Sequence, residues 1–83
     1  MSDSAQTVIV YGADWCPPCH VARGYLAKHG ISFEYRNVEE KDEWMRQAVQ
    51  KSGQNAIPVL DFGNDRIVVG FDRPKIDAAL GLA

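Results

Sequence analysis

The sequence predicts an α/β fold with the element order β-α-β-α-β-β-α, built as a four-stranded mixed sheet with helices on both faces. Three observations lead to this fold class. A β-branched run near the start is followed by two stretches with helical spacing of apolar residues, and a strictly alternating stretch separates the two. Two short apolar runs around a turn and one more helical stretch complete the chain. Because a helix joins the first two strands, we expect them to be parallel with a right-handed crossover, whereas the last two form an antiparallel hairpin.

The first half of the chain is expected to hold two strands around one helix. Residues 7–11 (TVIVY) are a continuous run that is typical of a strand buried on both faces. After a loop at 12–15, the pattern is helical from Pro17 to Gly30, which ends the helix. The apolar residues of its expected buried face are Val21, Ala22, Tyr25 and Leu26. Residues 31–36 (ISFEYR) alternate strictly and predict a half-buried strand.

The second half is expected to hold a helix, a hairpin and a last helix. The helix covers 40–52, and its buried face carries Trp44, Met45, Ala48 and Val49. Residues 59–62 and 66–69 are predicted strands that flank the turn 63–65 (GND), where glycine can supply a positive φ. Asp72 can cap the last helix. The buried residues of that helix are Ile76, Ala79 and Leu80.

Composition limits the function classes. The 83 residues are expected to form one domain spanning 1–83, in which the small polar residues 1–5 fray. A net charge of −2 gives no electrostatic footprint for nucleic acid, and no basic segment suits an anionic membrane. No apolar run reaches the ~18 residues of a membrane span, and the start of the chain lacks the pattern of a signal peptide. We therefore expect a monomer in the cytoplasm, with neither nucleic acid nor a membrane as partner.

The only two cysteines, Cys16 and Cys19, lie in the stretch ADWCPPCHV. Disulfides that serve stability are rare in a reducing compartment. The loop between these two cysteines is also too short to constrain the unfolded chain much, because the entropy of closure grows with loop length. The pair therefore indicates chemistry rather than structural support.

Cys16 falls at the expected N-cap of the first helix, where unpaired N–H groups and the helix dipole stabilise a thiolate. Such a thiolate is a nucleophile and a good leaving group. Cys19 lies one turn further along, so this spacing permits attack on a substrate disulfide by Cys16 and resolution of the mixed disulfide by Cys19. Pro17 costs nothing at the first helical position. Pro18 removes the N–H of the second position, so we expect Cys16 to receive fewer hydrogen bonds.

Two other interpretations of the pair stay open. Both cysteines could be buried hydrophobic residues without chemistry. They could also bind metal, although one Cys-x-x-Cys pair supplies two thiolates and zinc or iron–sulfur sites usually need four protein ligands. A metal site would therefore need a dimer that binds zinc or an iron–sulfur cluster through Cys16, or thiols from outside. Our first interpretation is the redox pair, with no metal ligand in the chain.

Four segments occur here in a combination that is known from one family. They are the strand end Tyr11-Gly12, the Cys-x-x-Cys helix start, Ile57-Pro58-Val59 and Gly70-Phe71-Asp72. Together they resemble the glutaredoxins and, more broadly, the thioredoxin fold, from about residue 6 to the C-terminus. The resemblance implies a thiol–disulfide oxidoreductase that carries electrons in cell redox homeostasis, with a redox-active disulfide and no bound cofactor.

The resemblance also implies how substrates bind. It implies that the Ile57–Pro58 peptide bond is cis and lies beside the cysteines, and that the backbone of Ile57 pairs with the substrate. The residues we assign to substrate binding are Trp15, Pro17, Pro18, Ile57, Pro58, Gly70, Phe71 and Asp72. The implied substrates are protein disulfides, and the implied reductant is thioredoxin reductase or glutathione as a co-substrate.

Departures from the family pattern concern the reductant. Glutaredoxins usually carry a basic residue three before the first cysteine, which helps to hold the glutathione carboxylate, and here it is Ala13. The segment Val69-Gly70-Phe71-Asp72-Arg73 lacks one glycine and one aspartate of the usual motif, and the usual tyrosine between the cysteines is Pro18. Gly70-Phe71 resembles redoxins that thioredoxin reductase reduces. The buried acid of thioredoxins is replaced by Val10.

Overall fold

The computed structural model describes residues 7–81, so the expectation that 1–5 fray falls outside the described part of the chain. The predicted order of elements is confirmed: β1 (Val8–Gly12), α1 (Pro17–Lys28), β2 (Phe33–Asn37), α2 (Asp42–Ser52), β3 (Val59–Asp61), β4 (Ile67–Val69) and α3 (Arg73–Leu80). The element ends differ slightly from the prediction, since β2 and α2 both begin two residues later. Within 7–81, none of the helices has the length and apolar character needed to cross a membrane.

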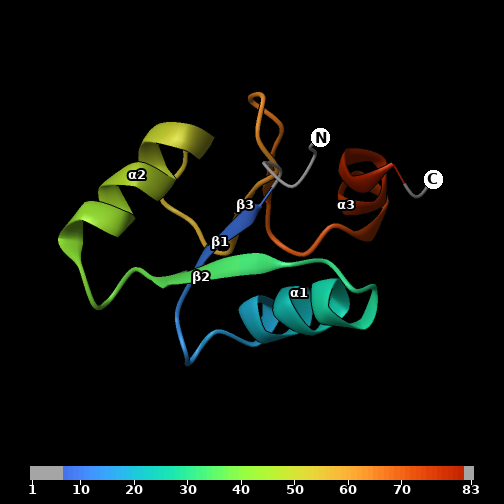
Figure 1. The fold of residues 1–83 in the computed structure, drawn as a ribbon. Coiled ribbons are helices and arrows are strands. Elements are labelled where there is room, and N and C mark those ends of the chain that lie inside the picture. The colour runs from blue at the N-terminus through green and yellow to red at the C-terminus, as the bar shows by residue number, and fades with distance from the viewer. Residues whose placement is uncertain (1–6, 82–83) are drawn as a thin grey trace.

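The four strands form one mixed sheet in the order β2-β1-β3-β4 (Figure 1). β1 pairs in parallel with β2, as predicted, and antiparallel with β3, whereas β3 and β4 form the predicted antiparallel hairpin. Since β1 has a neighbouring strand on each side, its end at Gly12 lies in the middle of the sheet. The loop that carries the cysteines leaves the sheet from this central position.

Alternation along the strands divides the core between the two faces of the sheet. α2 lies on one side of the sheet and α1 and α3 lie on the other (Figure 1). Val10 pairs with Leu60, which in turn pairs with Val68, and this row packs with Leu26 of α1 and Ile76 of α3. The next row of the sheet faces α2. The core cluster between this face of the sheet and α2 consists of Tyr11, Val38, Ala48 and Val59. The prediction of helices on both faces is therefore confirmed.

One residue of the predicted buried face of α1 is exposed in the structure. Val21 is 50% exposed, whereas Ala22 and Leu26 are fully buried. Successive helical residues are about 100° apart around the axis. The buried stripe of α1 runs through Cys19, Ala22 and Leu26, so Val21 turns toward solvent beside it. The prediction for Val21 was wrong because apolar spacing alone allowed a wider stripe than the sheet covers.

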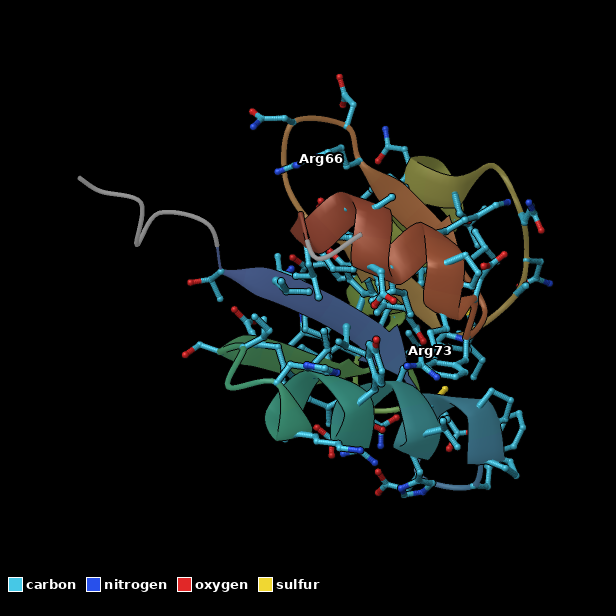
Figure 2. All side chains as sticks on the ribbon, turned by 90° about the vertical axis from the view of Figure 1, so that its right-hand side faces the viewer. Arg66 and Arg73 are labelled. Carbon is cyan, nitrogen blue, oxygen red and sulfur yellow. The ribbon has the colours of Figure 1, made fainter. Side chains whose placement is uncertain are left out.

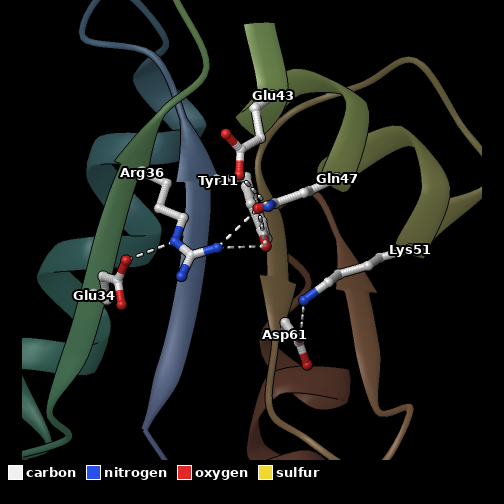
Figure 3. A network of polar contacts seen from close by, with 7 residues as sticks. All are labelled: Tyr11, Glu34, Arg36, Glu43, Gln47, Lys51 and Asp61. Atoms are coloured by element: carbon white, nitrogen blue, oxygen red, sulfur yellow. Dashed lines mark hydrogen bonds and ion pairs between the residues drawn. The ribbon is translucent and has the colours of Figure 1, made fainter. Parts of the chain in front are cut away.

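A polar network joins α2 to the face of the sheet that it covers. Its members are Tyr11, Glu34, Arg36, Glu43, Gln47, Lys51 and Asp61 (Figure 3). The Tyr11 hydroxyl donates to Gln47 Oε1 at 3.2 Å, and Arg36 Nη1 donates to the same oxygen at 2.8 Å. Lys51 Nζ donates to Asp61 Oδ2. The buried phenol of Tyr11 is thus satisfied, as a polar group without water must be.

Helix α3 is fixed at both ends by side chains that reach its neighbours (Figure 2). Asp72 caps it, as predicted, by accepting a hydrogen bond from the Lys75 N–H at 3.2 Å. Arg66, which follows the hairpin turn and directly precedes β4, donates to the carbonyl oxygen of Ala79 at 3.1 Å. Arg73 lies over the Tyr25 ring of α1, with 5.7 Å between its guanidinium carbon and the ring centroid. The contact of Arg73 with Tyr25 holds the start of α3 close to α1.

The Lys51–Asp61 pair generates a prediction about acid stability. Partial burial alone would raise the pKa of Asp61, but the bonds from Lys51 and the Gly63 N–H outweigh it, so this pKa lies below its ordinary value. A lowered carboxyl pKa contributes stability that is present above the unfolded pKa of ~3.9 and is lost as pH falls through the folded value. We expect Asp61→Asn to lower the unfolding free energy by roughly 1 kcal/mol at neutral pH and to reduce the loss of stability on acidification.

Urea unfolding from pH 7 down to pH 2 measures both effects. Asp65→Asn is the matched control, because Asp65 is an exposed residue of the hairpin turn. Equal unfolding free energies for Asp61→Asn and the unchanged protein over the whole range would contradict the prediction.

Candidate active site

Cys16 is the N-cap of α1, as predicted. Its backbone is extended, with φ −95° and ψ 107°, and its Sγ accepts a hydrogen bond from the Cys19 N–H at 3.3 Å. The loop before it is closed by the Cys16 N–H, which donates to the carbonyl oxygen of Ala13 at 3.2 Å. The sulfur therefore sits at the positive end of the helix dipole and uses one of the unpaired N–H groups of the first turn.

Cys19 lies in the first turn of α1 and is fully buried. Both cysteines are reduced thiols in this structure. Burial, and after it the hydrogen bond with Cys16, raises the pKa of Cys19 to about 12. Cys19 therefore stays protonated near neutral pH and serves as a donor toward Cys16. This asymmetry fits attack by Cys16 and resolution by Cys19.

The two prolines between the cysteines occupy the first two positions of the helix. Both are exposed at the surface. Since Pro18 has no N–H, the amide of Cys19 is the one backbone donor to Cys16 Sγ among the described residues. The predicted loss of one donor to Cys16 is thus present in the geometry of the cap.

The Ile57–Pro58 peptide bond is cis, as the family resemblance implied. Ile57 packs against the small cluster formed by Ala13 and the two cysteines, and Pro58 is fully buried. The carbonyl oxygen of Pro58 accepts a hydrogen bond from the Gly70 N–H at 2.7 Å. The structure therefore brings Ile57, Pro58 and Gly70 together with the cysteines.

The other predicted binding residues fall into two groups. Trp15 is 66% exposed next to Cys16, and its indole N–H donates to Glu39 Oε2 at 2.7 Å. Phe71 and Asp72 are partly buried and make contacts within the fold instead. Phe71 packs edge-on against Tyr25, with 5.6 Å between the ring centroids, and Asp72 caps α3. Their proposed contact with substrate stays a prediction.

His20 follows Cys19 but makes its contacts elsewhere. Its Nε2 contacts the carbonyl oxygen of Asp14, and its Nδ1 accepts from Arg23 Nη2 at 2.9 Å. Both ring nitrogens are used in this way, so His20 is not available to either sulfur as a base. Within 7–81 there is no cluster of three or more metal-ligating side chains, so a metal would need ligands from elsewhere.

Gly12, which the sequence places at the strand end Tyr11-Gly12 without a role at the site, packs against Cys19. A Cβ atom built at Gly12 would lie 2.8 Å from Cys19 Sγ and 3.0 Å from Cys19 Cβ, closer than carbon and sulfur atoms can approach. The end of β1 therefore needs glycine so that the first turn of α1 can pack on it. The presence of glycine directly before the cysteine loop was the only available signal.

Known proteins resemble this chain in sequence and in structure. The family model for glutaredoxin matches residues 8–67. The chain is 27% identical to glutaredoxin 3 of Escherichia coli (strain K12) over 75 residues, 90% of each chain. It is 30% identical over 53 residues to the glutaredoxin-like protein NrdH of Lactococcus lactis, covering 64% of this chain and 72% of that one. A crystal structure of a glutaredoxin from Archaeoglobus fulgidus matches with a TM-score of 0.81 at 25% identity, covering 90% of this chain and 86% of the other.

The close contact at Gly12 predicts the effect of a single methyl group. Gly12→Ala places a carbon 2.8 Å from Cys19 Sγ, so the first turn of α1 must move. We expect a loss of roughly 1–3 kcal/mol in unfolding free energy, together with slower closure of the disulfide. Gly24→Ala is the control, because nothing lies within 4 Å of a Cβ there and alanine is the better helix former. Denaturation and thiol oxidation rates measure the two effects, and a Gly12→Ala protein that matches Gly24→Ala in both would contradict the prediction.

The missing N–H at Pro18 predicts a shift in redox potential. Pro18→Ala restores a donor to the N-cap sulfur, which stabilises the reduced form by up to about 1.4 kcal/mol and raises the standard potential by up to about 30 mV. Pro17→Ala is the control, since the N–H of the first helical position does not bond to an N-cap side chain. Equilibration with a glutathione redox buffer measures the potential. An unchanged or lower potential for Pro18→Ala would refute the role of the missing donor.

Proposed function

This chain belongs to the glutaredoxin family, and on that premise we propose that it reduces protein disulfides by cycling Cys16 and Cys19 between dithiol and disulfide. The family gives the coarser activity, thiol–disulfide exchange. The observation that carries the proposal is the difference between the two thiols. Cys16 Sγ caps the helix, whereas Cys19 is fully buried and holds its proton.

The proposed reaction has two exchange steps. The thiolate of Cys16 attacks one sulfur of the substrate disulfide, a mixed disulfide forms, and the other substrate sulfur leaves and takes a proton. Cys19 then loses its proton and attacks Cys16 Sγ, so the second substrate sulfur leaves as a thiol. The substrate gains two electrons and two protons, and the protein ends as the Cys16–Cys19 disulfide.

Two features of the surface support protein disulfides as substrates. Trp15, Pro17 and Pro18 are exposed next to Cys16 and form an apolar rim around it. Aromatic side chains of this kind are enriched where proteins meet. Ile57, the residue before the cis peptide, packs against the same cysteines, and a backbone at this place suits an extended segment of a partner.

Two features favour thioredoxin reductase over glutathione as the electron donor. Ala13 is fully buried with the cysteines and offers no charge for a glutathione carboxylate. The Gly70-Phe71 pair lies in the segment that resembles redoxins reduced by thioredoxin reductase. Glutathione is the second candidate for the donor.

A coupled turnover assay tests which electron donor reduces the protein. The oxidised protein and a disulfide substrate are mixed with NADPH and thioredoxin reductase in one cuvette, and with glutathione, glutathione reductase and NADPH in another. We expect NADPH consumption in the first. Turnover only in the second would make glutathione the donor, and silence in both would overturn the proposed function.

The two cysteine variants separate the steps. Cys16→Ser is expected to abolish turnover, because the attacking thiol is lost. Cys19→Ser is expected to accumulate the mixed disulfide with a protein substrate, because resolution is lost, and intact-mass measurement detects that adduct. Adduct formation by Cys16→Ser instead would reverse the assignment of the two thiols.

A further inference from the structure

A closed set of contacts beside Cys19 is not used by the reaction proposed above. Its members are Asp14, His20, Arg23 and Tyr35. Arg23 Nη2 donates to His20 Nδ1 at 2.9 Å, and His20 Nε2 contacts the carbonyl oxygen of Asp14. The Tyr35 hydroxyl donates to Asp14 Oδ1 at 3.0 Å, and the Arg23 guanidinium carbon lies 3.9 Å from the centroid of the Tyr35 ring. The contacts form a ring that holds Arg23 in one place.

This set borders the sulfur of Cys19. Arg23 follows Cys19 by four residues on α1, so the two side chains lie on the same face of the helix, one turn apart. A Cβ atom built at Gly12 would lie 2.8 Å from Cys19 Sγ and 3.4 Å from Tyr35 Cε1. The Cys19 sulfur and the edge of the Tyr35 ring therefore both lie next to Gly12. The ring on which Arg23 stacks is thus a neighbour of the thiol.

Arg23 also carries a donor that has no acceptor. Its Nε is buried and has no hydrogen-bond partner within the described residues. Such buried donors cost free energy unless a partner arrives during function. A guanidinium with a free buried N–H, one turn from a buried thiol, is suited to a negative charge that forms only transiently.

We propose that Arg23 is a positioning residue for the resolving step, and that its fixed positive charge stabilises the Cys19 thiolate that attacks the mixed disulfide. The proposal rests on the proposed function and assigns a part of its mechanism. In this step Cys19 loses a proton, the Cys19–Cys16 bond forms, the bond from Cys16 to the substrate breaks, and the substrate sulfur leaves with the electron pair and takes up a proton.

The charges that face Cys19 explain why a cation matters at this step. In the dithiol, burial and then Cys16 raise the pKa of Cys19 to about 12, whereas the backbone of Ala13 and, to a lesser degree, the charge of Arg23 act to lower it. Once Cys16 is part of a mixed disulfide it can no longer be a thiolate, so its opposition to a second negative charge disappears. Among the other neighbours, Tyr35 stays protonated because burial and the Asp14 bond raise its pKa to about 12. His20 is occupied by Arg23 and Asp14. Arg23 is then the main charge acting on the thiol.

Titration of Cys19 alone is the first test. In a Cys16→Ser protein Cys19 is the single thiol, since the sequence has two cysteines. The ultraviolet absorbance of the Cys19 thiolate, followed against pH, gives a midpoint that needs no reagent to reach the buried sulfur. We expect Arg23→Met in this background to raise the midpoint by about one pH unit, and Arg23→Lys to raise it less. Arg46→Met is the control: it removes the same charge from an exposed position of α2 and should leave the midpoint unchanged.

The resolving step itself is the second test. Cys16 is loaded with a chromogenic aromatic thiol, and release of that thiol by Cys19 is followed in a rapid mixing experiment. We expect Arg23→Met to slow release about three- to fourfold at neutral pH, because a one-unit shift lowers the thiolate fraction tenfold while the more basic thiolate is the better nucleophile. Arg46→Met should leave the release rate unchanged. Equal midpoints and equal release rates for Arg23→Met and the unchanged protein would overturn the proposal.

The Arg23→Gln variant distinguishes the loss of the positive charge from the loss of the hydrogen bonds that Arg23 donates. Glutamine keeps N–H donors for His20 but carries no charge, so the proposal requires it to behave as methionine does. A folded Arg23→Gln protein with the midpoint of arginine would overturn the role of charge. Neither readout needs a reductase or a protein substrate, so a protein that turns over no disulfide but shows the shift would overturn the proposed function and leave the role of Arg23 standing.

Discussion

The site depends on one close approach between α1 and the end of β1. Gly12 has no side chain, and any Cβ there would collide with Cys19 Sγ. The first turn of α1 can therefore settle directly on the central part of the sheet, and this places Cys16 at the N-cap with Cys19 behind it. The hydrogen bond from the Cys19 N–H to Cys16 Sγ follows from that placement. The position of the first turn of α1 on the sheet therefore determines where both sulfur atoms lie.

The two thiols differ in chemistry although they differ little in exposure. Cys16 is 3% exposed and Cys19 is 0% exposed, so accessibility alone cannot assign their roles. Their places on the helix do so. Cys16 Sγ, at the N-cap, accepts an amide hydrogen bond and lies in the field of the helix dipole. Cys19 lies one turn further along the helix, where burial raises the pKa of its thiol to about 12. A short spacing thus converts two identical side chains into an attacking group and a proton-holding partner.

Local patterns sufficed for much of the fold and part of the site. β-branched and alternating runs marked the strands, and the position of Cys16 before two prolines marked the helix start, because these features depend on neighbours in sequence. Val21 was misplaced, since spacing does not say how wide a stripe the sheet covers. The contacts of Gly12 and Tyr35 with the site were not predicted, for a related reason. Their importance comes from contacts across the fold, such as that between Tyr35 and Asp14, which are 21 residues apart.

The most direct test of this arrangement is to treat the reduced protein with a limiting amount of iodoacetamide at neutral pH and to map the modified cysteine by mass spectrometry. A sulfur at the helix N-cap beside a buried thiol that holds its proton predicts modification at Cys16, with Cys19 modified only after denaturation. Equal modification of both cysteines in the folded protein, or modification of Cys19 first, would contradict the assignment of Cys16 as the attacking group.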